Sequence, residues 1–171
     1  MEWEDVPWWY GERASLGLFA LAAWEVGAAP LEEFSIEKGK GRGGYTGRGD
    51  LLISIAKKKF IIEAKQEWIS ISNRATKRED KLDDAILEAL DGAQDATGRG
   101  RRAGLVFAVP YLSENEEDSV DDRLSAWIEE LRGWGDCAIA WVFLKDARRE
   151  FILDGYLYPG ITVLIRPLRR P

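Results

Sequence analysis

Histidine is absent from the 171-residue sequence, and cysteine nearly so. Without an imidazole, Ser-His-Asp hydrolysis, histidine-metal nucleases and histidine-dependent ribonucleases are excluded. The single cysteine, Cys137, lies in an apolar stretch, so it cannot form an internal disulfide and is expected to fill core space. Any chemistry must therefore rest on carboxylates, lysine and a bound metal.

Long apolar runs and a basic N-terminal leader are also lacking. No run approaches the roughly 18–20 residues that a membrane span needs, and the chain begins Met-Glu-Trp-Glu-Asp instead of with the basic residues of a signal peptide. We therefore expect a cytoplasmic protein with no membrane partner. The length fits one α/β domain with a sizeable core.

Acidic residues outnumber basic ones, which gives a net charge of −6, but the basic residues are concentrated in the middle of the chain. Residues 38–102 contain 15 basic and 10 acidic residues, a local excess of +5, whereas the remainder contains 9 and 20. The glycine-rich stretch 38–49 adds backbone amides that can approach phosphates closely, although it lacks the Gly-Lys-Ser/Thr of a Walker A loop. A polyanion is therefore expected to bind this middle segment.

Hydrophobic periodicity predicts the element order α-β-β-β-α-β-α-β, followed by short closing strands. Helices are expected at 12–26, 80–96 and 124–131. Strands are expected at 31–37, in a hairpin over 49–66, and at 105–109, 137–144, 150–153 and 161–165.

The hairpin over 49–66 organises the prediction. A turn centred on Lys57 and Lys58 puts Asp50 opposite Lys65, and the two-residue period of a strand puts Glu63 on the same face. The other face is apolar and is expected to lie under the helix at 80–96. Directly opposed residues lie roughly 5 Å apart. Asp50 and Glu63 are then close enough to share a divalent cation, with Lys65 reaching the same space; a solvated strand end is the alternative interpretation.

Gly49-Asp50 followed, after an apolar strand, by Glu63-Ala64-Lys65 resembles the PD-(D/E)XK nuclease signature of the restriction-endonuclease-like superfamily, with Gly49 in place of the usual Pro. The resemblance implies an αβββαβ core with a central mixed sheet flanked by helices. It also implies a metal-dependent DNA endonuclease in repair, recombination or phage defence. On this resemblance Asp50 and Glu63 bind Mg²⁺ or Mn²⁺ with the Ala64 carbonyl, and Lys65 orients or activates the attacking water.

Glu12-Arg13 resembles the Glu-Arg that opens the first helix of archaeal-type Holliday-junction resolvases, where the Glu approaches the metal. Glu25 is the competing candidate, and a role at the helix dipole or in solvent remains open for both. The residues expected to contact DNA are Lys38, Lys40, Arg42, Arg48, Gln66, Arg74, Lys77 and Arg78.

Phosphate contacts position a protein without specifying base sequence, so we expect recognition of DNA structure such as junctions, flaps or ends. Symmetric cutting of a branched duplex suggests a homodimer. Trp3, Trp8 and Trp9 are expected to pack either on the body or on a second subunit. The alternative from another class is a catalytically inactive domain of this fold that acts as a nucleic-acid-binding or protein-interaction module.

Overall fold

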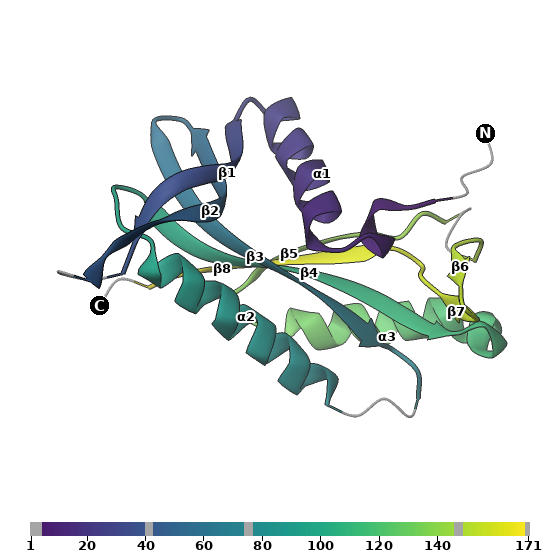
Figure 1. Cartoon of the computed structure of the whole chain (residues 1–171). Helices are drawn as coiled ribbons and strands as arrows, with labels where there is room; N and C mark the ends of the chain where they lie inside the picture. Colours follow the sequence, from purple (N-terminus) through teal and green to yellow (C-terminus); the bar gives the residue numbers. More distant parts are fainter. Residues whose placement is uncertain (1–4, 40–42, 74–76, 146–148, 170–171) are drawn as a thin grey trace.

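One mixed β-sheet forms the centre of the protein, with helices on both faces (Figure 1). The computed structural model describes residues 5–39, 43–73, 77–145 and 149–169. The main strands run in the order β1-β2-β3-β4-β8-β5, and among them β3 and β4 pair in parallel while the other neighbours are antiparallel. The strands are β1 (Ala29–Lys38), β2 (Tyr45–Ile55), β3 (Lys58–Ser70), β4 (Arg101–Ser113), β5 (Ala138–Val142), β6 (Ile152–Leu153), β7 (Tyr156–Leu157) and β8 (Ile161–Pro167).

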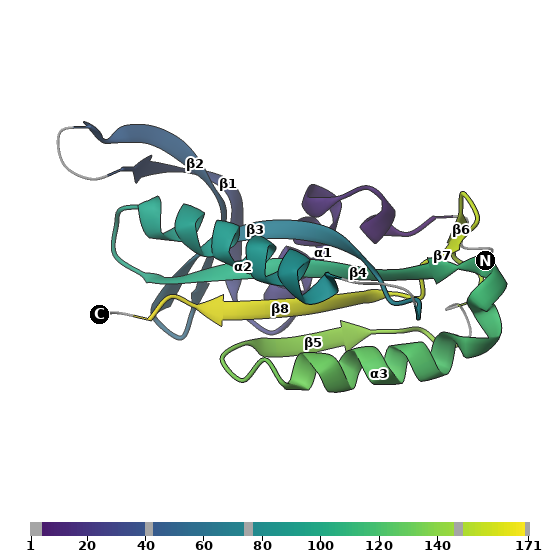
Figure 2. The same ribbon diagram turned by 90° about the horizontal axis from the view of Figure 1, so that it is seen from below.

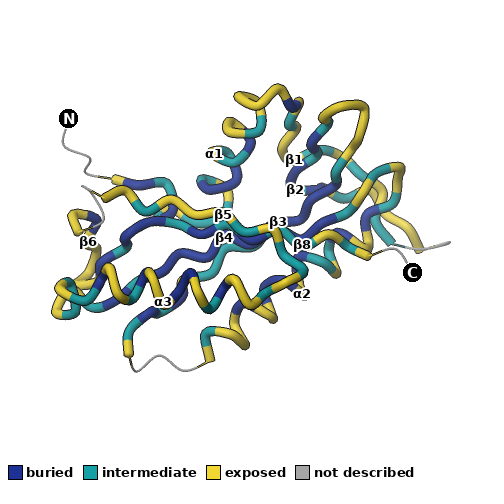
Figure 3. The backbone as a smooth tube through the Cα atoms, turned by 180° about the vertical axis from the view of Figure 1, so that it is seen from behind, coloured by how far each residue is buried: buried dark blue, intermediate teal, exposed yellow. Residues whose placement is uncertain are grey.

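The three α-helices divide between the two faces of the sheet. They are α1 (Glu12–Glu25), α2 (Arg78–Asp95) and α3 (Val120–Arg132), and two 3₁₀ helices, η1 (Pro7–Trp9) and η3 (Glu114–Ser119), complete the described helices. The helices α2 and α3 share one core with β3, β4 and β8, whereas α1 packs on the opposite face of β2, β3 and β4 (Figure 1). Figure 3 shows that burial is concentrated along the central strands, as expected for a sheet covered twice.

The sequence prediction of element types is confirmed for the three helices and for the main strands. The parallel β3–β4 pair requires a crossover, and α2 supplies it. The prediction missed β7, which is only two residues long and carries no periodicity of its own. No described helix has both the length and the apolar character that crossing a membrane requires.

The turn between β2 and β3 differs from the predicted one. Ala56 and Lys57 both adopt left-handed φ angles, 48° and 64°, as in a type I′ two-residue turn, and Ile55 pairs with Lys58. The ladder runs on to Leu51 opposite Ile62, so its continuation sets Asp50 opposite Glu63. The predicted pairing of Asp50 with Lys65 is therefore wrong by two residues. A shift of two leaves every side chain on its predicted face.

The prediction of which helix covers the apolar face of the hairpin is also wrong. Leu51, Ile53, Ile62 and Ala64 pack against Leu16 and Ala20 of α1. The helix α2 instead covers the face that carries Glu63, where Gly92 approaches the Glu63 side chain. The helix α2 therefore covers the acidic face, which is not simply a solvated strand end.

The strands β2 and β3 separate immediately beyond Asp50. Residues 45–49 of β2 pair only with β1, and residues 63–70 of β3 pair only with β4, so the β1–β2 hairpin extends away from the rest of the sheet (Figure 2). Within β1, Glu33 has a φ of 50°, a left-handed conformation that interrupts the strand where it faces Asp50. The sheet therefore opens at the point where the predicted site residues lie.

The N-terminal tryptophans pack on the body of the protein. Trp8 is only 7% exposed, and both Trp8 and Trp9 make edge-on contacts with Phe151. Trp9 also contacts Tyr158. Of the two roles left open by the sequence, packing on the body is the one these two residues take; Trp3 lies outside the described residues.

Candidate active site

The Asp50 side chain lies where the β2–β3 ladder ends. Its Oδ2 accepts a hydrogen bond of 2.7 Å from the backbone N–H of Ala64. A side-chain oxygen of β2 thus accepts a hydrogen bond from the β3 backbone beyond the last β2–β3 residue pair. This contact fixes one carboxylate oxygen against β3, one residue away from Glu63.

Glu63 is buried, with 8% of its surface exposed, although it carries a carboxylate. The Lys38 ammonium of β1 forms an ion pair with it, with Nζ 2.9 Å from Oε1. Burial raises the pKa of Glu63, the Lys38 ammonium opposes that rise, and the neighbouring Asp50 carboxylate adds to it. Two carboxylates and one ammonium therefore meet here, but the ammonium is that of Lys38.

Lys65 projects toward α2 from the same edge of β3. Its Nζ lies 2.6 Å from Oε1 of Glu88, and this hydrogen-bonded contact is the main cause that raises the pKa of Lys65. The charges of Glu12 and Asp50 also raise it. Lys65 is therefore held in its protonated form among three carboxylates.

Glu12 stands in the first turn of α1 and belongs to the same group of charges. Burial raises the pKa of Glu12, the Asp50 carboxylate raises it further, and the Lys65 ammonium lowers it. Glu25 lies at the other end of α1, about 20 Å along the helix axis at 1.5 Å per residue. Of the two competing glutamates, only Glu12 shares the electrostatic surroundings of Asp50.

Gln66 connects the site strand to α1 and η1. Its Oε1 accepts a hydrogen bond of 2.6 Å from Ser15 Oγ, and its Nε2 donates one of 3.0 Å to the Trp8 carbonyl oxygen. Both polar ends of the amide are therefore used inside the protein. Gln66 fixes the placement of α1, and with it Glu12, relative to β3.

The basic residues that the sequence assigns to DNA lie in several different settings. Arg48 pairs with Glu33 at 3.0 Å, and Arg78 pairs with Glu130 of α3 at 3.0 Å. Lys77 is exposed immediately before α2, whereas Lys38 is turned inward onto Glu63. Lys40, Arg42 and Arg74 lie outside the described residues. The described members do not form one continuous group, and their contact with DNA stays a prediction.

The donor atoms at the site suit a hard cation. Among the described residues, no three acidic, histidine or cysteine side chains stand close enough together to hold a metal ion. Mg²⁺ is commonly held by one or two carboxylates, with waters and substrate phosphates completing its shell. The Asp50 and Glu63 carboxylates fit that pattern and do not fit the closed ligand set of a structural zinc site.

Sequence reasoning missed four features of this site: Lys38 on Glu63, Glu88 on Lys65, Gly92 over Glu63, and the left-handed Glu33. The Lys38 and Gly92 contacts join residues far apart in the chain, and no spacing rule relates them. Glu88 had a usable signal, because the crossover between two parallel strands returns α2 across β3.

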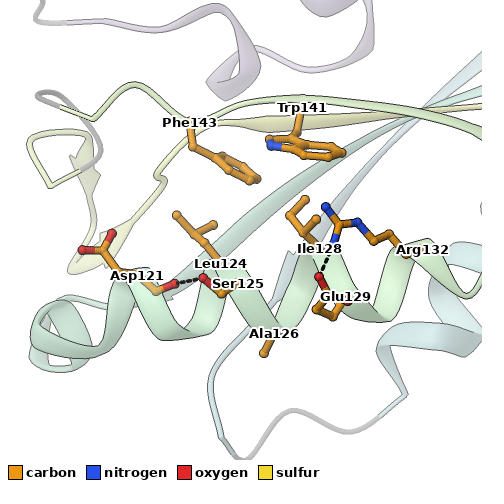
Figure 4. A pocket seen from close by; sticks show the side chains of 9 residues that line it. All are labelled: Asp121, Leu124, Ser125, Ala126, Ile128, Glu129, Arg132, Trp141 and Phe143. Atoms are coloured by element: carbon orange, nitrogen blue, oxygen red, sulfur yellow. Dashed lines mark hydrogen bonds and ion pairs between the residues drawn. The ribbon is translucent and has the colours of Figure 1, made fainter.

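A hollow between α3 and β5 has a volume of about 530 Å³. Figure 4 shows Leu124, Ile128 and Phe143 lining it, with Trp141 beside them. Among its polar residues, Arg132 pairs with Glu129 along α3, and Asp121 lies 3.6 Å from Arg149. It lies by the opposite edge of the sheet from β2 and shares no residue with the acidic site.

Comparisons with known proteins place the chain in no family. No protein-family model matches it, and neither the curated proteins nor the solved structures include a significant match. The functional argument therefore rests on the site itself.

Proposed function

We propose that the chain is a metal-dependent nuclease of the restriction-endonuclease-like type that hydrolyses phosphodiester bonds in DNA. The observation that carries the proposal is the meeting of the Asp50 and Glu63 carboxylates, with Lys65 alongside, where β2 and β3 separate. Burial raises the pKa of both Glu63 and Glu12, and carboxylates perturbed in this way gather at functional sites.

In this proposal each residue has one role. Asp50 and Glu63 would hold Mg²⁺ or Mn²⁺, with the Ala64 carbonyl as a further ligand, and Glu12 would stand behind them. A bound divalent cation supplies charge stabilisation at the phosphate and lowers the pKa of a coordinated water. Lys65, kept protonated by Glu88, would orient the attacking water and offset negative charge that builds on the phosphate.

The fold is compatible with the proposal but does not decide it, because one fold hosts many functions. The order α1-β1-β2-β3-α2-β4 and the mixed sheet agree with the core implied by the resemblance. The local excess of positive charge in residues 38–102 supports a polyanionic substrate. We retain structure-selective cleavage, because the described basic residues offer backbone contacts and no dense side-chain reading surface.

A second candidate function is an inactive binding module of the same fold. One observation favours it: the outer side of α1 exposes Leu18, Leu21 and Trp24, an apolar surface without a partner among the described residues. A binding module would need that surface and would not need the carboxylates.

The deciding experiment is a cleavage assay on supercoiled, linear, single-stranded and branched DNA with Mg²⁺ or Mn²⁺. Asp50→Ala, Glu63→Ala and Lys65→Ala should each abolish cleavage while circular dichroism stays native, because the first two remove ligands and the third removes the partner of the water. The matched control is Asp91→Asn, an exposed carboxylate of α2 outside the site. Robust cleavage by Asp50→Ala would refute the site assignment. Cleavage in EDTA would refute the metal requirement.

A further inference from the structure

The ion pair between Lys38 and Glu63 is unusual for a glycine-rich, basic segment. The two side chains are only 15% and 11% exposed, and the ammonium lies 2.9 Å from Glu63 Oε1. The ordinary fate of a lysine in such a segment is solvation, since burying it costs both hydration and side-chain entropy. The surrounding structure must therefore favour this inward position.

Two glycines make room for the pair. A Cβ on Gly47 would lie 3.2 Å from Cδ of Lys38, and a Cβ on Gly92 would lie 3.3 Å from Cγ of Glu63. The lysine stem thus crosses β2 at a glycine, and the glutamate stem lies beneath a glycine of α2. Both stems occupy space that any other residue at these positions would fill.

The backbone on either side of Lys38 is fastened to the end of α2. Gly39 N–H donates to the Asp95 carbonyl at 3.0 Å, and the Thr97 N–H and hydroxyl both donate to the Glu37 carbonyl, at 2.7 and 2.9 Å. Lys38 itself forms an isolated bridge with Ala96. The start of the lysine side chain is therefore fixed, and its four-carbon stem leads to the carboxylate.

The contact with Glu63 is an ion pair made by a single ammonium group. The ammonium lies 2.9 Å from Glu63 Oε1, and charge attraction within this ion pair holds it there. An ammonium is a point charge on a flexible stem, and it exchanges partners more readily than a bidentate guanidinium does. A divalent cation that bound Asp50 and Glu63 together would compete with the ammonium for the same Glu63 carboxylate.

We propose that Lys38 is a built-in competitor of the metal: its ammonium neutralises the Asp50–Glu63 pair and must leave Glu63 before a divalent cation can bind there. This inference rests on the proposed function, because it assumes that these two carboxylates are the metal ligands. Lys38 then acts as a positioning residue that keeps two like charges together and sets the metal concentration at which the site fills. It is distinct from Lys65, which Glu88 holds on the other side of the site.

Isothermal titration of the full chain with Mn²⁺ tests the inference without using activity. Lys38→Met keeps the length of the stem and removes the charge, so it should bind Mn²⁺ at least tenfold more tightly than the wild type, about 1.4 kcal/mol. Lys38→Arg should remain within threefold of the wild type. The matched control Lys58→Met removes an exposed lysine at the β2–β3 turn and should leave the affinity unchanged within twofold.

A second variant leaves every charge in place. Gly47→Ala puts a methyl group against the Lys38 stem and should also tighten Mn²⁺ binding, so the test survives if Lys38→Met fails to fold. If the folded Lys38→Met and Gly47→Ala variants bind Mn²⁺ no more tightly than the wild type, the inference is overturned. The proposed function still stands in that case, provided that the wild type binds Mn²⁺. Absence of Mn²⁺ binding by every protein at millimolar concentration would overturn the proposed function, and the inference with it.

Discussion

Replacing Lys38 with Met should destabilise the fold at neutral pH and leave it nearly unchanged in acid. The substitution removes the charge that lies 2.9 Å from Glu63 Oε1 and preserves the stem that crosses Gly47. Removing one partner of a buried ion pair costs about 3–5 kcal/mol, and we expect roughly 2 kcal/mol here because the pair lies at the open edge where β2 and β3 separate.

The dependence on pH identifies Glu63 as the cause. Burial raises its pKa above the ordinary 4.5, Lys38 of β1 acts against that rise, and Asp50 of β2 adds to it. A carboxyl whose pKa is higher in the folded state contributes stability that is fully present below the unfolded value and is lost as pH rises through the folded value. Without Lys38 the folded pKa rises further. The penalty should therefore be near zero below the ordinary carboxyl pKa of 4.5 and should grow as pH rises through the raised pKa of Glu63.

Urea unfolding followed by tryptophan fluorescence, in EDTA at about pH 4, 6 and 8, measures this penalty. Lys58→Met is the control for loss of one lysine, and it should show no pH-dependent change. In the double variant Lys38→Met with Glu63→Gln, no buried charge is left unpaired, so most of the stability should return. An equal loss at pH 4 and pH 8, or a double variant as unstable as the single one, would refute the reasoning.

Three further outcomes test separate contacts. Gly92→Ala should reduce the cleavage rate at least tenfold, because its Cβ would lie 3.3 Å from Cγ of Glu63. Urea unfolding should show equal or higher stability, since Ala favours a helix by about 1 kcal/mol. An unchanged cleavage rate would mean that Glu63 need not be held in place. Glu88→Gln removes the main contact that raises the pKa of Lys65, so the alkaline loss of cleavage in a pH–rate profile should begin at lower pH; an unmoved profile would exclude Lys65 as its source. Neutralising Lys40, Arg42 and Arg48 together should weaken the salt dependence of DNA affinity measured by anisotropy. The slope of log affinity against log salt concentration should become shallower by about 0.9 for each phosphate that is no longer neutralised. An unchanged slope would mean that this segment only connects two strands.

The sequence was sufficient to predict which segments are helices and which are strands, because a strong hydrophobic periodicity identifies them even where the register is predicted wrongly. The spacing of Leu82, Ile86 and Ala89 predicts a helix with one apolar face. The continuous apolar run in β4 indicates a strand that is buried on both sides. The grouping of Asp50 and Glu63 on one face also survived, because a two-residue slip of register does not exchange faces.

The exact register and the helix placement were beyond sequence reasoning for identifiable causes. The connection Ala56-Lys57-Lys58 has no glycine or asparagine to mark which two residues take left-handed φ angles, so the turn cannot be positioned. The helix α1 is apolar on most sides and therefore does not indicate which surface it covers. The Lys38–Glu63 contact joins β1 to β3 across a strand between them, where charge patterning gives no guidance.

The left-handed Glu33 links the opening of the sheet to the charges around it. A non-glycine residue in this conformation costs about 1–3 kcal/mol and persists only where neighbouring contacts hold it. Arg13 of α1 lies 3.2 Å from one Glu33 oxygen, and Arg48 of β2 lies 3.0 Å from the other. The same glutamate therefore interrupts β1 opposite Asp50 and forms exposed ion pairs with α1, which carries Glu12, and with β2. Phe34, the next residue, covers Gly49, where a Cβ would lie 2.6 Å from the ring, so glycine is required before Asp50 in this bend. Packing in this chain thus explains the glycine that stands where the PD-(D/E)XK signature has proline, and its presence does not argue against the proposed nuclease site.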